Sequence, residues 1–231
     1  RRTHNWIMCW LYTGTFGSFI GFSAAFPLLA KILFPEVNAL QYAFLGPLVG
    51  AVSRALAGKA CDRIGGGRIT LWVFVAMSLG VLGILYAIGM KGDPTAFPVF
   101  FSSFLFLFAA SGVGNASTFQ MIPAIMRKEV ARLEPSLTGE ARTRQSDKES
   151  AAIIGFSSAI AAYGAFFIPK SFGTSISLTG GAESALYAFL IFYLSCIAIT
   201  WWFYTRRGGL LFDVERGGGP QAPTTTLTSV T

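Results

Sequence analysis

The chain has 231 residues, of which 53% are hydrophobic and only 13% are charged, and its mean hydropathy is +0.56. Soluble domains contain about 25% charged residues, so this composition argues against a soluble enzyme and against an intrinsically disordered protein. The formal net charge of +7 is compatible with nucleic-acid binding, but the high apolar content argues against that class too. The composition therefore predicts a membrane protein.

Long apolar runs predict helices that cross a bilayer, because such a helix needs about 20 mostly apolar residues. We predict them over the ranges Trp6–Leu29, Leu40–Cys61, Ile69–Met90, Ala96–Met126, Ala151–Phe172 and Ala185–Tyr204. These runs are continuously apolar and lack the alternation of membrane β-strands. The expected fold class is an all-α membrane protein with six transmembrane helices, which form one bundle over residues 1–205.

The cations are distributed unevenly between these runs. Of the 18 Lys and Arg, most lie before the first run, after the last, or after the second and fourth. The exceptions are Lys31, Lys91, Lys170 and Arg54. Because cytoplasmic loops of membrane proteins carry an excess of Lys and Arg, we predict that both ends of the chain are cytoplasmic.

Two polar segments interrupt or follow the apolar runs. Residues 127–150 mix basic, acidic and Ser side chains, and we expect a cytoplasmic loop there, with at most a short surface helix, that divides the helices three plus three. Residues 206–231 are rich in Gly, Pro and Thr, which predicts a disordered cytoplasmic tail.

The chain starts with Arg1 and not Met, so we expect it to be a piece of a longer protein. His4 is expected to be a solvated side chain and not a metal ligand.

The first and fourth runs contain weakly similar tripeptides. Thr15-Phe16-Gly17 lies in the first, and Thr118-Phe119-Gln120 lies in the fourth. Transporters built from inverted three-helix repeats place these two helices in equivalent positions. This similarity is compatible with a 3+3 inverted repeat, although chance also explains it.

Arg54 is the one cation deep inside a predicted span, because Lys59 and Lys170 lie only two residues from the ends of theirs. Gly46, Gly50 and Gly58 flank it at intervals of four residues, so all share one helix face that allows close approach of a helix or ligand. A charge at membrane depth costs about 2.5–3.5 kcal/mol, and no carboxylate of this chain is expected there. A guanidinium donates parallel hydrogen bonds to a planar oxyanion, so we interpret Arg54 as part of an anion site. Alternatively, it pairs with a group in a missing part of the protein or extends toward the cytoplasm.

The segment that follows this span, Gly58 to Arg68, has the pattern G-x-x-x-D-R-x-G-x-x-R. It resembles a cytoplasmic loop of the major facilitator superfamily. Its glycines permit a tight turn, and Asp62 can cap a helix N-terminus or pair with Arg63 or Arg68. We predict a conformational switch that locks one face of a transporter and releases it. An ordinary solvated turn is the alternative.

Other spans contain side chains suited to an anion site. Tyr12 and Phe16 lie four residues apart in the first span, where a Tyr hydroxyl can donate to an anion and a Phe ring can pack against it or close a gate. Asn115 belongs to a polar stretch of the fourth span, and buried polar groups in a membrane need partners. The fifth span is rich in small residues, among them Gly164. Plain helix packing is the alternative for all of these residues.

Taken together, the chain resembles the second half of a bacterial nitrate/nitrite porter of the major facilitator superfamily. The strings that carry the resemblance are TFGSFIGFSAAFPLL, FPEVNALQYAFLGPLVGAVSRALAGKACDRIGGGR, STFQMIP and GFSSAIAAYGAFFIPKSFG. The resemblance implies that Arg54 is the membrane-embedded substrate arginine, that Tyr12 and Phe16 line the pocket, and that Phe119 is a gate aromatic. The fifth span corresponds to the family's nitrate-signature segment, which is commonly richer in glycine where this chain has Ala161 and Ala165.

The resemblance implies transport of nitrate and nitrite by alternating access in a bacterial inner membrane. The predicted substrate contacts are Arg54, Tyr12, Phe16, Asn115, Phe119 and Gly164, and the predicted switch comprises Gly58, Asp62, Arg63 and Arg68. A second arginine would come from an N-terminal six-helix half, so this chain holds half a site. The expected partners are the two anions, that half and the lipid bilayer, without a cofactor or nucleic acid.

The mode of coupling and the function itself each have more than one interpretation. Proton symport often uses a membrane carboxylate, and none is expected in this half, which favours nitrate/nitrite exchange over proton-coupled symport. Two further hypotheses for the function are a carrier for another small anion and a non-transporting membrane scaffold. An enzyme is not expected, because no nucleophile–base pair or metal cluster lies at membrane depth.

Overall fold

The structure, a computed structural model, describes residues 3–90, 92–207 and 209–211. Throughout these residues all regular elements are helical. They are α1 (Thr3–Tyr12), a π-helical segment (Thr13–Gly17), α2 (Ser18–Leu33), a 3-10 turn (Ala39–Gln41), α3 (Leu45–Ile64), α4 (Gly66–Gly89), α5 (Ala96–Leu133), α6 (Gly139–Ala162), α7 (Gly164–Thr179), α8 (Glu183–Thr200) and a π-helical end (Trp201–Thr205). The prediction of an all-α protein is confirmed for this part of the chain.

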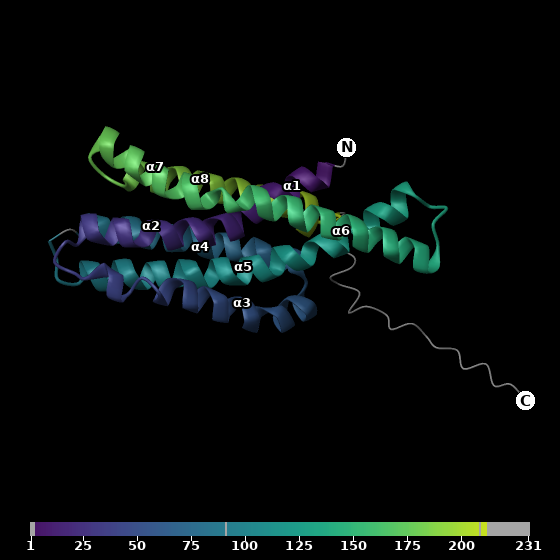
Figure 1. Ribbon diagram of the computed structural model, residues 1–231, viewed down its shortest axis with the longest axis horizontal. Coiled ribbons are helices and arrows are strands. Elements are labelled where there is room, and N and C mark those ends of the chain that lie inside the picture. Colours follow the sequence, from purple (N-terminus) through teal and green to yellow (C-terminus); the bar gives the residue numbers. More distant parts are fainter. Residues whose placement is uncertain (1–2, 91, 208, 212–231) are drawn as a thin grey trace, which may run out of the picture.

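The helices form an elongated bundle (Figure 1). α5 packs between α3 and α4, while α7 packs on α2 and α8 on α4. α1 continues through the first π-helical segment into α2, and α6 continues into α7 with a break at Tyr163. Successive long segments run in opposite directions along the bundle, so the turns from α3 to α4 and from α5 to α6 lie at the same end.

Several helices have the length and composition of membrane spans. Within the described residues, five helices are long and apolar enough to cross a bilayer, and they are Thr3–Leu33, Gly66–Gly89, Ala96–Leu133, Gly139–Thr179 and Glu183–Thr205. The remaining predicted span, Leu40–Cys61, largely coincides with α3, which is not among these five helices. Its 20 residues include Arg54, Lys59 and Asp62, and these charges make it too polar to qualify by composition.

The two ends of the bundle differ in charge. We call the end where α3 meets α4 and α5 meets α6 the basic end. Its described cations are Lys59, Arg63, Arg68, Arg127, Lys128, Arg132, Arg142, Arg144, Lys148, Arg206 and Arg207. Lys31 and Lys170 belong to the opposite half of the bundle. The side of the membrane on which the basic end lies stays a prediction.

The loop predicted over 127–150 is mostly helical. α5 continues to Leu133 and α6 begins at Gly139, so only residues 134–138 separate the two helices. Side chains one turn apart support the polar start of α6, since Gln145 donates to Glu149 at 2.9 Å and Arg144 lies 3.7 Å from Glu140. Polar composition alone did not distinguish this solvated helix from a loop.

The predicted tail begins against the bundle. Leu211 is buried, and the carbonyl oxygen of Leu210 accepts a hydrogen bond from Nζ of Lys128 at 2.5 Å. The other described residues of the range are 206, 207 and 209. The prediction of disorder for the rest of 206–231 falls outside the described residues.

Aromatic packing forms much of the core. Phe26 of α2 contacts Phe104 of α5 with ring centroids 5.2 Å apart, and Phe104 contacts Phe100 at 4.9 Å. All three rings are buried. Large apolar side chains such as Trp72 and Ile191 are exposed on the outside, which fits helices that face lipid.

Glycines bring α3 and α5 into direct contact. A Cβ atom added at Gly112 would lie 2.1 Å from the carbonyl oxygen of Gly50, and one added at Gly46 would lie 2.3 Å from the ring of Phe108. The expectation that this face of α3 permits close approach is confirmed.

The predicted tight turn after α3 is confirmed as well. Gly65 alone separates α3 from α4, and its φ of 102° is a conformation that favours glycine.

Candidate functional site

An open pocket of about 340 Å³ lies between α3 and α5. Its lining residues are Ala51, Arg54, Ala55 and Gly58 of α3 with Ala116, Phe119 and Gln120 of α5. Arg54 lies one helical turn beyond Gly50, whose backbone touches Gly112, so the close helix crossing places the guanidinium at this pocket. Within the described residues Arg54 forms no hydrogen bond or salt bridge, and the pocket lining contains no carboxylate. The arrangement leaves a positive charge available to an anion.

Tyr12 and Phe16 lie next to each other where α1 passes into the first π-helical segment. Their rings stack with centroids 5.3 Å apart and an angle of 21° between the planes. Tyr12 is buried at the end of α1, with Ser158 of α6 beside its hydroxyl. Neither Tyr12 nor Phe16 belongs to the lining of the pocket that contains Arg54, so their part in a shared anion site stays a prediction.

Two predicted contacts on α5 differ in exposure. Phe119 lines the pocket and is 39% exposed, so its ring is free to pack against a ligand or a partner surface. Asn115 is only 1% exposed, and its Oδ1 atom has no hydrogen-bond partner among the described residues. Because buried polar groups are normally satisfied, this amide is suited to a polar ligand or partner.

Gly164 does not line the pocket that contains Arg54. A Cβ atom added there would lie 2.3 Å from the carbonyl oxygen of Gly17, so Gly164 brings α7 against the first π-helical segment. It lines a separate, mainly apolar pocket of about 440 Å³. Ala161 is buried against Gly17 as well, whereas Ala165 is exposed. A role of Gly164 in substrate binding stays a prediction.

The predicted switch residues are placed differently from our expectation. Asp62 lies on the last turn of α3 and accepts a hydrogen bond from Nε2 of Gln120 on α5. In the described chain no ion pair joins it to Arg63, which is exposed, or to Arg68, which is half-buried. The possible pairing across the turn is not seen because the carboxylate, one turn beyond Gly58 on the same helix face, lies toward α5. The role of these residues as a conformational switch stays a prediction. Gln120 was not identified as a functional residue from the sequence, although its polar side chain in an apolar span was a usable signal.

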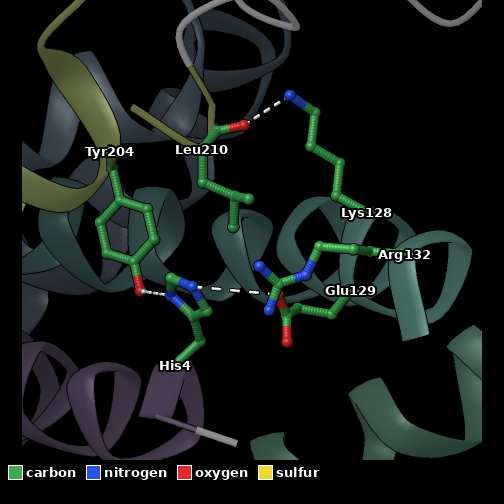
Figure 2. Close-up of polar contacts among 6 residues, drawn as sticks. All are labelled: His4, Lys128, Glu129, Arg132, Tyr204 and Leu210. Atoms are coloured by element: carbon green, nitrogen blue, oxygen red, sulfur yellow. Dashed lines mark hydrogen bonds and ion pairs between the residues drawn. The ribbon is translucent and has the colours of Figure 1, made fainter. Parts of the chain in front are cut away.

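A second polar cluster lies at the basic end (Figure 2). Nδ1 of His4 is 3.1 Å from the hydroxyl of Tyr204, and its Nε2 is 4.0 Å from Oε1 of Glu129. Nη2 of Arg132 lies 3.3 Å from the same carboxylate oxygen. Glu129 is only 2% exposed. The expectation of a solvated His4 was wrong, because this side chain connects α1, α5 and the π-helical end that follows α8.

The two weakly similar tripeptides of the first and fourth predicted spans contact each other in the bundle. Oγ1 of Thr15 lies 3.1 Å from Oγ1 of Thr118, and both side chains are buried. In an inverted repeat the first and fourth helices are equivalent, and equivalent residues meet where they lie close to the pseudo-two-fold axis. The contact is compatible with such a repeat, and the repeat itself stays a prediction.

Comparison with known proteins relates the chain to bacterial transporters. It is 45% identical over 210 residues to the nitrate/nitrite transporter NarU of Salmonella typhimurium and 43% identical over 211 residues to NarU of Escherichia coli. It is 36% identical over 213 residues to the probable nitrate/nitrite antiporter NarK2 of Thermus thermophilus. The matches cover 90% of this chain but only 45%, 45% and 43% of the three relatives, so the chain spans less than half of their length. No family model matches the chain.

These matches confirm the resemblance to bacterial nitrate/nitrite transporters. The relatives are named as transporters and not as enzymes. Together with the helices that can cross a bilayer, they identify the chain as part of a multi-pass membrane protein.

Proposed function

We propose that this chain is the C-terminal half of a transporter that carries nitrate and nitrite by alternating access. The observation that carries the proposal is Arg54, a cation on the wall of an open pocket with no anionic partner among the described residues. The names of its relatives support nitrate and nitrite as the anions.

The chemistry of the pocket suits a small planar oxyanion. The guanidinium offers paired hydrogen bonds in one plane, and in this proposal the hydroxyl of Tyr12 donates a further one to the anion. The ring of Phe119 provides a flat apolar surface in the pocket lining. Phe16, which stacks on Tyr12, and the buried amide of Asn115 lie outside that lining, and in this proposal they reach the anion when the two halves close around it. In this proposal an N-terminal six-helix half supplies a second arginine and closes the open side of the pocket.

The proposal includes α3 as the sixth membrane span. An uncompensated arginine in a span costs about 2.5–3.5 kcal/mol, and a bound anion would offset part of that cost. The excess of Lys and Arg at the basic end then places that end, and both ends of this chain, in the cytoplasm of a bacterium. The two groups of three spans form the inverted repeat.

Exchange of nitrate for nitrite is the proposed mode of coupling. Each anion in turn neutralises Arg54, so the transporter changes between its outward-open and inward-open states with the site occupied in both directions. The pocket lining contains no carboxylate to relay a proton, and Glu129, the buried carboxylate at the basic end, lies outside that lining. The relative named as a probable nitrate/nitrite antiporter supports this mode.

Uptake by the full-length protein tests the anion site. Arg54→Ala is expected to abolish nitrate uptake, and Arg54→Lys to reduce it strongly because an ammonium lacks the paired donors. Lys59→Ala is the matched control, since it removes an exposed cation of the same helix that does not line the pocket. Near-normal uptake by both Arg54 variants would refute the site, and stronger competition by a carboxylate than by nitrite would refute the substrate class.

A separate assay tests the coupling. Proteoliposomes that contain the full-length protein are loaded with nitrite or left without it, and a pH gradient is imposed. Exchange predicts nitrate accumulation only with internal nitrite. Accumulation driven by the pH gradient in liposomes without nitrite would show proton symport instead.

A further inference from the structure

We propose that Gln120 is a positioning residue that couples the anion pocket to the basic end of α3 through Asp62. The inference rests on the proposed function, because it assigns a role in the transport cycle to a residue of the same pocket. Gln120 lines that pocket together with Arg54 and Phe119, and its side chain crosses from α5 to α3.

The direction of the contact follows from the hydrogen-bonding groups. Nε2 of Gln120 donates to Oδ1 of Asp62 and lies 3.5 Å from the carbonyl oxygen of Gly58. Both partners are acceptors, so the amide nitrogen, and not the amide oxygen, faces α3. A single side chain thus contacts two successive turns of α3, which begin one turn beyond Arg54.

The contact differs from the packing at the other side of Arg54. At Gly50 and Gly112 the backbones of α3 and α5 touch, which leaves no room for either helix to approach further. At Gly58, in contrast, no atom lies within 4 Å of an added Cβ position. Here the amide of Gln120 bridges the two helices, and a polar bridge can break and form again without opening a close-packed apolar contact.

We call the hydrogen bond between Gln120 and Asp62 the clasp. This arrangement allows the clasp to open during transport. With the bond formed, Gln120 holds the basic end of α3 against α5 and borders the pocket. A movement of α3 away from α5 at this end would break the bond, while the glycine crossing would act as the pivot. Because Arg54 lies between the pivot and the clasp, the position of the guanidinium changes with the state of the clasp.

Kinetics of the full-length protein in proteoliposomes test this role. Gln120→Ala is expected to lower the maximal rate of nitrate exchange about fivefold, the size of effect of one hydrogen bond, and to leave KM within about twofold because Arg54 is intact. Gln145→Ala is the control, since it removes another helical Gln that bonds only a neighbour on α6. Its rate is expected to equal that of the unaltered protein.

A reciprocal exchange of the two groups provides a readout that general destabilisation would not produce. Gln120→Glu places two carboxylates opposite each other and should lower the rate further than Gln120→Ala. Adding Asp62→Asn restores an amide–carboxylate pair with the donor on the other helix, and should recover most of the rate. The double variant keeps the experiment decisive even if Gln120→Ala fails to fold.

Two results would overturn the inference. One is an unchanged maximal rate for Gln120→Ala, and the other is a Gln120→Glu, Asp62→Asn double variant no faster than Gln120→Glu alone. Either result, combined with loss of uptake in Arg54→Ala, would refute the clasp and leave the anion site intact. Normal uptake by Arg54→Ala would instead refute the proposed function.

Discussion

Substitution of Gly112 by Ala tests whether the contact between α3 and α5 builds the pocket. The added Cβ would lie 2.1 Å from the oxygen and 2.8 Å from the carbon of the Gly50 carbonyl, whereas ordinary contacts begin at 3.4 Å. Both obstacles are backbone atoms, so the helices must move apart by about 1 Å. Overpacking of this kind costs about 1–3 kcal/mol, and the better helix propensity of Ala returns at most about 1 kcal/mol.

The expected result is a lower thermal midpoint of the full-length protein and a smaller stabilisation by nitrate. The second effect follows because Arg54 lies one turn from Gly50 and moves with α3. Unfolding is followed with and without nitrate, and the stabilisation by a ligand depends on its concentration relative to Kd. Gly112→Ala should therefore shift the nitrate dependence to higher concentrations.

Gly155→Ala is the matched control. Gly155 also lies within a helix, but nothing lies within 4 Å of its added Cβ. It gains the same helix propensity without a clash, so its thermal midpoint should stay the same or rise. Equal midpoints and equal nitrate responses for the Gly112 and Gly155 variants would refute the reasoning.

Three further predictions concern stability and are measured by thermal unfolding of the full-length protein. Gly65→Ala should destabilise it by about 1–3 kcal/mol, because the φ of 102° strains any side chain with a Cβ; an unchanged midpoint would contradict this. Thr15→Val and Thr118→Val should couple by about 0.5–1.5 kcal/mol in a double-mutant cycle, because their hydroxyls lie 3.1 Å apart, whereas strict additivity would exclude the bond. Tyr204→Phe should cost about 1 kcal/mol through loss of the bond to His4, and the same change in a His4→Ala background should have no such cost.

The glycine face of α3 was predictable because it depends on local properties. A period of about four residues places Gly46, Gly50 and Arg54 together in any helix, whatever packs against them. The cost of an unpaired charge among apolar residues is equally independent of the neighbour. The sequence therefore determined that the chain is helical and apolar, that its cations cluster by segment, and that this face approaches another helix.

Only the tertiary structure decided which groups meet across helices. Periodicity assigns Asp62 to a face but does not say that α5 lies opposite, so the bond to Gln120, 58 positions away, could not be derived from the turn motif. The contact of His4 with Tyr204, 200 positions apart, escaped prediction for the same reason. Gly164 was assigned to the ligand from its segment, while the packing places it against Gly17. Helix faces follow from the spacing of residues along one helix, whereas partners follow from how several helices fill space together.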